Sequence, residues 1–117
     1  MSFDIDKPRL PPAYVSIYLI AAKVANEHGY ALCCHGSFAT DLDLVAVPWL
    51  PVVSTRDELV DSLCERLSAM RGDPMTIDGR RPPPKPHGRV VETLLFGGGY
   101  YIDLSVMPAV EPMEGYE

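Results

Sequence analysis

The chain has 117 residues, of which 10 are Lys or Arg and 16 are Asp or Glu, so its formal net charge is −6 at pH 7. This length leaves room for one compact domain, 1–117, and the acidic excess argues against a general nucleic-acid binder, which needs surplus Lys and Arg. No apolar run approaches the ~20 residues of a membrane span, and the amino terminus lacks the order of a secretory signal, so we expect a cytoplasmic protein without membrane contact.

The first half of the chain predicts one helix and two strands. Residues 1–12 are polar and interrupted by prolines, which indicates an extended lead-in. From Ala13 to His28 the apolar residues follow the three-and-four spacing of one helix face, and Gly29 suits the left-handed exit. The apolar run 30–35 predicts a buried strand that ends at a tight turn, and 41–47 predicts a second strand beside it, closed by Pro48.

The second half predicts another helix and a hairpin. Thr55 and Glu58 have the spacing of a capping box, and the helix that follows ends near Gly72. Residues 73–89 form a proline-rich basic loop, 90–96 and 100–107 read as a hairpin around a glycine turn, and 108–117 is a tail. This order predicts an α+β domain in which two helices cover one face of a four-stranded sheet.

The three cysteines do not have metal-ligand spacing. Cys33, Cys34 and Cys64 form an odd set without a Cys-x-x-Cys pair or a matching histidine cluster. A structural zinc site is therefore not expected, and we interpret the three side chains as small buried hydrophobes.

Three aspartates carry the strongest chemical signal. Asp41 and Asp43 lie two residues apart on a predicted strand, so they project from the same side about 6–7 Å apart. Asp103 lies on a later strand, where Ile102 and Leu104 take the core face. Three carboxylates on one open face could hold two Mg²⁺ (or Mn²⁺) ions for phosphoryl or nucleotidyl transfer. The alternatives are exposed acids at a strand start and, for Asp103, a pair with an arginine or an edge charge.

Other polar residues could contact a phosphate. Gly36 permits close backbone approach, and the hydroxyl and N–H of Ser37 can meet a phosphate oxygen. Arg89, in the basic loop, could bind a phosphate or an acidic partner, although a solvated arginine is the simpler interpretation. Trp49 could stack on a base or pack at the edge of the core.

These motifs together resemble a known family. His35–Ser37, followed by Asp41–Leu44 and later by Tyr101–Leu104, is similar to the signature of the polymerase-beta-type nucleotidyltransferase superfamily. In size and in the run Val47–Trp49 the chain also resembles small phage and prophage members. The resemblance implies a small mixed sheet with helices on one side, a nucleoside triphosphate donor and an unidentified acceptor. It further implies that the three aspartates are catalytic and bind metal, and that the Gly-Ser pair binds nucleotide phosphate.

A second hypothesis comes from another class of protein. Only Phe38–Thr40 separates the Gly-Ser pair from the acidic pair, a shorter segment than the family usually has, and the chain is small and acidic. These features suit a non-catalytic binding protein that keeps the fold, such as a phage-encoded inhibitor of a host defence complex. For either function, a homodimer could supply the missing wall of a shallow cleft.

Overall fold

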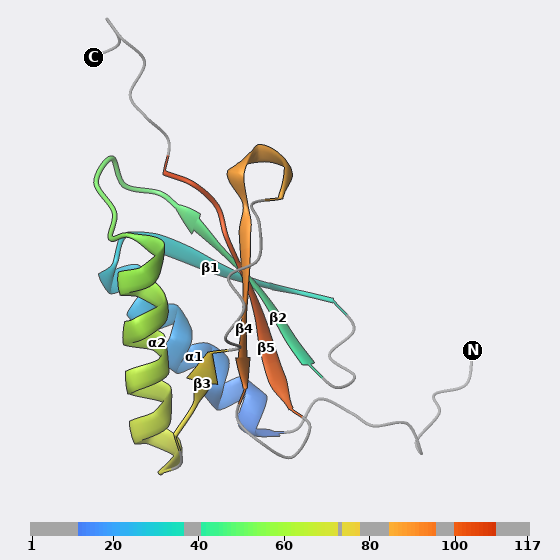
Figure 1. The fold of residues 1–117 in the computed structure, drawn as a ribbon. Coiled ribbons are helices and arrows are strands. Elements are labelled where there is room, and N and C mark those ends of the chain that lie inside the picture. Colours follow the sequence, from blue (N-terminus) through green and yellow to red (C-terminus); the bar gives the residue numbers. More distant parts are fainter. Residues whose placement is uncertain (1–11, 37–40, 73, 78–84, 96–99, 110–117) are drawn as a thin grey trace, which may run out of the picture.

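The computed structural model describes residues 12–36, 41–72, 74–77, 85–95 and 100–109. These residues form two helices and five strands, an α+β arrangement with a mixed sheet (Figure 1). In chain order the elements are α1 (Pro12–Glu27), β1 (Tyr30–His35), β2 (Asp41–Pro48), α2 (Arg56–Arg71), β3 (Thr76–Ile77), the short 3₁₀ helix η1 (Pro86–Gly88), β4 (Val90–Leu95) and β5 (Tyr101–Val106). The predicted lead-in up to residue 11, the glycine turn at 97–99 and the tail from 110 lie outside the described residues.

The sheet has the strand order β1-β2-β5-β4-β3. All neighbours are antiparallel except β2 and β5, which run parallel. The predicted pairing of the first two strands and the predicted hairpin of the last two are both confirmed. Neither described helix is long and apolar enough to cross a bilayer.

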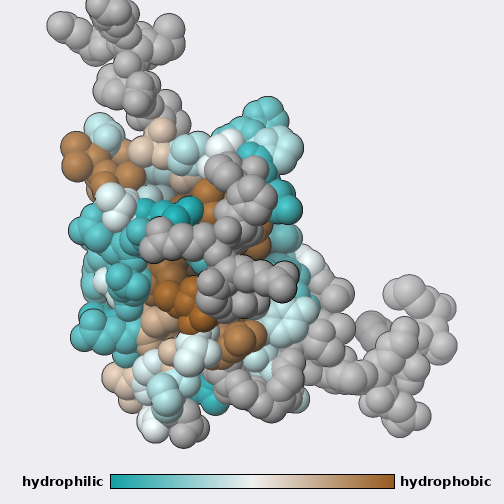
Figure 2. Space-filling view, viewed as in Figure 1, coloured by the Kyte–Doolittle hydropathy of each residue, from teal (hydrophilic) through white to brown (hydrophobic). Residues whose placement is uncertain are grey.

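Both helices lie on one side of the sheet (Figure 1). Alternate residues of the central strands are buried toward them, among them Leu42 and Leu44 of β2 and Ile102 and Leu104 of β5. The helices bury matching stripes in the same core, while the outer side of α2 is hydrophilic (Figure 2). Because side chains alternate along a strand, the intervening residues of β2 and β5 project from the sheet face that carries no helix. We call this the open face.

One ion pair on the helix-covered side joins a buried carboxylate to a half-buried arginine. Glu92 of β4 is only 6% exposed, and its carboxylate lies 3.4 Å from Nε of Arg56 in the first turn of α2. A buried carboxylate is costly unless a cation or donors compensate it, so Arg56 must stay at this position. The pair therefore fixes the start of α2 against β4.

The prediction of four strands is wrong, because β3 adds a fifth. Thr76 and Ile77 pair with Leu95 and Leu94, at the end of β4. A two-residue strand has no alternation for a sequence pattern to detect, and it forms because the chain leaving α2 passes beside β4. It occupies the beginning of the segment predicted as a proline-rich loop.

The prediction that the cysteines are buried is wrong for two of them. Cys33 and Cys34 are exposed, and Cys64 is half-buried. The two exposed thiols belong to β1, which is the outermost of the five described strands. Burial raises the pKa of the Cys64 thiol to about 11, so that group stays protonated at neutral pH.

The capping box at the start of α2 is confirmed, and it gives a stability test. The Thr55 hydroxyl accepts a bond from the Glu58 N–H at 3.2 Å, and the Glu58 carboxylate accepts one from the Thr55 N–H at 3.0 Å. Thr55→Ala removes the first bond and should lower the free energy of unfolding by about 1 kcal/mol, measured by urea denaturation. Thr55→Ser keeps the hydroxyl and serves as the control. An equal loss in both variants would contradict this role.

Candidate functional site

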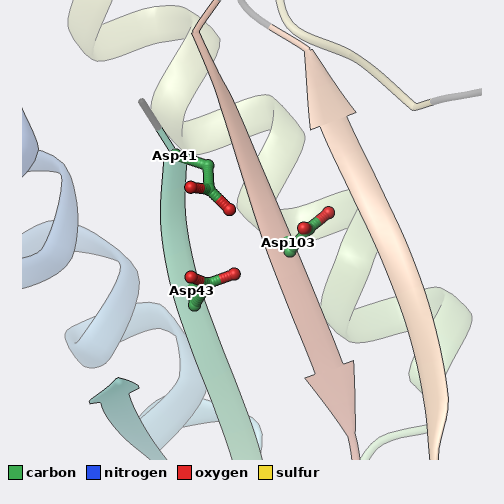
Figure 3. Close-up of side chains that lie close together, drawn as sticks. All are labelled: Asp41, Asp43 and Asp103. Carbon is green, nitrogen blue, oxygen red and sulfur yellow. The ribbon is translucent and has the colours of Figure 1, made fainter. Parts of the chain in front are cut away.

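The three predicted aspartates come together on the open face. Asp41 and Asp43 project from β2 and Asp103 from the neighbouring β5, and the three side chains lie close together (Figure 3). One carboxylate oxygen of each residue lies within 4.8 Å of one from each of the others. All three side chains are half-buried. The structure therefore confirms that the late aspartate converges with the early pair.

The register of two parallel strands produces this convergence. Asp43 is paired directly with Asp103, and Asp41 with Tyr101. Paired residues on neighbouring strands share a face, so Asp103 lies on the same side as Asp43, and Asp41 is there because it is two residues away. A shift of the pairing by one residue would turn Asp103 toward the helices.

The electrostatics of the cluster are unfavourable without a cation. The pKa of Asp43 is raised by burial first, then by its hydrogen bond with Asp41 and by the charges of Asp41 and Asp103. The neighbouring His35 acts in the opposite direction. Burial and the like charges beside it thus disfavour the ionised form of Asp43, and a bound cation would favour that form.

Gly36 adjoins the cluster from the end of β1. Its φ of +91° is in the left-handed region, and a β-carbon at this position would collide with the Asp43 carboxylate, with Cγ only 3.1 Å away. Glycine is thus required both by the backbone conformation and by the space that Asp43 occupies. Ser37, the other half of the predicted phosphate-binding pair, lies outside the described residues.

Two further residues extend the cluster into a row across the sheet. His35 of β1 is paired with Asp43, and Thr93 of β4 is paired with Asp103. The Thr93 hydroxyl donates a hydrogen bond of 3.1 Å to Oδ1 of Asp103. Sequence reasoning gave His35 little weight and did not single out Thr93, because the row depends on registers that the sequence does not fix.

Tyrosines lie at the Asp41 end of the cluster. The charge of Asp41 raises the pKa of Tyr101, with smaller contributions from burial and from the other two aspartates. Burial, with a contribution from Asp41, raises the pKa of Tyr14 to about 12. Tyr14 packs edge-to-face against Tyr100, with ring centroids 5.9 Å apart. Both Tyr14 and Tyr101 therefore remain neutral beside the carboxylates.

Arg89 lies on the open face but beside the cluster, not in it. Its guanidinium donates a 3.3 Å hydrogen bond to the hydroxyl of Ser105. Ser105 is two residues beyond Asp103 on the same strand, so both face the same side. Among the residues the structure describes, Arg89 has no carboxylate partner. The predicted phosphate-binding arginine is thus near the aspartates and not neutralised by them.

Comparison with known proteins adds no relative: no family model, no curated protein and no solved structure matches the chain. The geometry of the acidic cluster is consequently the main basis for a functional argument.

The raised pKa of Asp43 predicts how stability depends on pH. The folded protein holds the Asp43 proton more tightly than the unfolded chain does. The loss of folding stability caused by ionisation of Asp43 is therefore absent below the pKa of this group in the unfolded chain and complete above its pKa in the folded protein. In metal-free buffer, Asp43→Asn should therefore raise the melting temperature near pH 7 by on the order of 2–4 °C. The gain should shrink toward about pH 4, where the native carboxyl also becomes neutral.

Asp61, an exposed residue of α2, supplies the matched control for this experiment. Asp61→Asn removes the same charge away from the cluster and should leave the melting temperature nearly unchanged. A gain at Asp43 that did not vary with pH would show that repulsion among the carboxylates is not its cause.

Proposed function

We propose that the protein is a metal-dependent nucleotidyltransferase, which transfers a nucleotidyl group from a nucleoside triphosphate to an unidentified acceptor. The observation that carries this proposal is the convergence of Asp41, Asp43 and Asp103 within 4.8 Å on an open sheet face. The resemblance of the Gly-Ser and Asp-x-Asp motifs to the polymerase-beta-type superfamily supports the same chemistry.

The donor set suits a hard divalent cation. Mg²⁺ prefers oxygen ligands at about 2.1 Å, so that opposite ligands of an octahedral site lie about 4.2 Å apart. Adjacent ligands of such a site lie about 3 Å apart, so the carboxylate oxygens of the cluster, which lie within 4.8 Å of one another, would move inward on binding the ion. A cation here would also offset the burial and the neighbouring carboxylates that raise the pKa of Asp43. Mn²⁺, with the same preference for oxygen, would serve as a substitute.

Each residue then has a distinct task. Asp41 and Asp43 would hold the metal ions together, and Asp103 would help to hold one of them and accept the proton of the acceptor hydroxyl. The ions supply charge neutralisation on the transferring phosphoryl group and on the leaving oxygen. Thr93 would orient Asp103 through the hydrogen bond to Oδ1, which leaves Oδ2 available for metal. Gly36, Ser37 and Arg89 would contact the nucleotide phosphates.

Titration calorimetry with Mg²⁺ or Mn²⁺ and each nucleoside triphosphate tests this function. The native protein should bind at least one metal–nucleotide pair and release pyrophosphate when an acceptor is present. Asp43→Ala should abolish both, since it removes a central ligand. Asp61→Ala is the control of equal charge change and should behave like the native chain. Absence of binding heat with all nucleotides would refute the proposal.

A positioning role for Thr93 can be tested with the metal alone. Removal of a hydrogen bond to a metal ligand commonly costs about 10-fold or more in affinity. Thr93→Val should therefore weaken Mn²⁺ binding by about 10-fold, measured by electron paramagnetic resonance of free Mn²⁺, with the melting temperature little changed. Thr93→Ser keeps the hydroxyl and should restore binding. Equal affinities in Val and Ser variants would exclude this role.

A second candidate, non-catalytic binding of a basic partner, is favoured by the surface of α2. Asp57, Glu58, Asp61 and Glu65 are all exposed on this helix, and the chain as a whole is acidic. Such a charged stripe would steer association with a basic protein surface. If Asp41→Ala with Asp103→Ala leaves the biological effect intact and reversal of the α2 charges removes it, binding is the function.

A further inference from the structure

Arg89 is a half-buried cation on the open face. Among the residues that the structure describes, no carboxylate pairs with it, and its guanidinium donates a single hydrogen bond, to the Ser105 hydroxyl at 3.3 Å. A guanidinium has five N–H donors, so most of its donors are unused by the described part of the chain. In a chain with a net charge of −6, this arrangement leaves a cation available for an external anion.

The hydroxyl that holds the guanidinium is itself buried. Ser105 is 5% exposed although it belongs to the open face. It lies between its paired neighbours, Val45 of β2 and Val91 of β4. A buried hydroxyl needs a hydrogen-bond partner, so Ser105 fixes the position of the guanidinium. An arginine that is already held in place loses less conformational freedom when an anion binds.

The backbone that leads into Arg89 is a closed turn. The Lys85 N–H donates to the Arg89 carbonyl at 2.6 Å, and the Gly88 N–H donates to the Lys85 carbonyl at 3.1 Å. His87 has a φ of +67°, in the left-handed region, and a β-carbon on Gly88 would lie 3.1 Å from Cγ of Pro108. Such a conformation persists only where the surroundings hold it. The turn therefore presents Arg89 from a fixed position.

Arg89 and Gly36 lie on opposite sides of the acidic cluster. In the sheet order, β1, which leads into Gly36, adjoins β2, whereas β4, which follows Arg89, adjoins β5. The three aspartates lie on β2 and β5, between these two strands. Ser105 follows Asp103 by two residues on the same face, so the guanidinium lies about 6–7 Å farther along β5.

This arrangement separates the donor from the acceptor. The phosphate chain of a nucleoside triphosphate leaves its first phosphate in one direction, so it can extend from the cluster toward Gly36 or toward Arg89, but not toward both. In phosphoryl transfer the attacking and leaving oxygens are roughly in line. When the leaving phosphates lie toward Gly36, the acceptor hydroxyl approaches from the side of Arg89. Asp103, proposed to accept the hydroxyl proton, belongs to β5 on that same side.

We propose that Arg89, held by Ser105, binds a phosphate of the acceptor, so that the second substrate is a phosphorylated hydroxyl compound. A guanidinium pairs with two oxygens of a phosphate through its planar fork. A separation of about 7 Å corresponds to about five covalent bonds of ~1.5 Å between the hydroxyl and the phosphate. Sugar phosphates and nucleoside monophosphates both have this length.

The acceptor role rests on the proposed function, whereas the anion site at Arg89 does not. In the reaction, the acceptor oxygen forms a bond to the first phosphorus of the triphosphate while the bond from that phosphorus to the pyrophosphate oxygen breaks. The hydroxyl proton passes to the Asp103 carboxylate, and pyrophosphate leaves on the Gly36 side. The acceptor's own phosphate stays on Arg89 unchanged.

Inorganic phosphate and the metal-free protein test the anion site. Added phosphate should raise the melting temperature of the native chain in a saturable way. Arg89→Gln should weaken this binding at least about 10-fold, because charge-assisted hydrogen bonds are lost. Arg89→Lys keeps the charge and should restore part of the binding, which distinguishes lost recognition from a damaged fold.

Arg66→Gln is the matched control for the anion site. Arg66 is half exposed and pairs with Glu27 at 3.6 Å, so the variant removes one positive charge away from the open face. Because phosphate also stabilises proteins by exclusion from their surface, the readout is the difference between the two glutamine variants. Equal responses of the native chain, Arg89→Gln and Arg66→Gln would overturn the site.

Pyrophosphate release by the native protein tests the acceptor role. With Mn²⁺ and a nucleoside triphosphate, phosphorylated acceptors should have a kcat/KM at least about 10-fold higher than their unphosphorylated forms. Ribose against ribose 5-phosphate and a nucleoside against its monophosphate are the two comparisons, and they distinguish the two sources of the phosphate. Inorganic phosphate should raise the KM of the acceptor and leave that of the triphosphate unchanged.

The possible failures can be told apart. Competition of inorganic phosphate with the triphosphate alone, or equal rates with phosphorylated and unphosphorylated acceptors, would overturn the acceptor role while the proposed function stands. Absence of metal–nucleotide binding would refute the proposed function and the acceptor role together, but phosphate binding that depends on Arg89 would still establish the anion site.

Discussion

The parallel pairing of β2 with β5 is the constraint on which the rest of the structure depends. Asp43 lies opposite Asp103 only in this register. The same register aligns the buried leucines of both strands against the helices. Hydrophobic burial on one face thus determines the carboxylate arrangement on the other, because a slip by one residue would expose the core and bury the acids together. The core holds the site in place against the repulsion among its carboxylates.

The site itself opposes folding in the absence of a cation. Repulsion and burial both raise the pKa of Asp43, and Gly36 is confined to a conformation that other residues adopt at a cost. Local features that work against stability persist only where the surrounding structure compensates for them. Here the compensation comes from a sheet whose other face is covered by both helices. This imbalance between a favourable core and an unfavourable acidic face is typical of functional sites.

Features that depend on residues close together in the chain could be predicted from the sequence. Strand alternation predicted that Asp41 and Asp43 share a face, and the Thr55–Glu58 spacing predicted the start of α2; both are confirmed. The parallel pairing of β2 and β5 joins segments separated by α2, β3 and β4, and no local pattern encodes such a register. Thr93 was not identified as a partner of Asp103 because it depends on the exact register of the β4–β5 hairpin, and Glu92 was not identified as a partner of Arg56 because that pair depends on how α2 packs against β4. The exposure of Cys33 and Cys34 has the same origin, since only the complete strand order shows that β1 is an edge.

Strand β1 links the outer edge of the described sheet to the acidic cluster. The strand has one described neighbour, and its last residue, His35, leads directly into Gly36, against which the Asp43 carboxylate packs. A strand paired on one side opens more easily than one paired on both, because fewer hydrogen bonds hold it. Any strand that adds to the outer side would therefore restrict the end of β1, and with it the space available to Asp43.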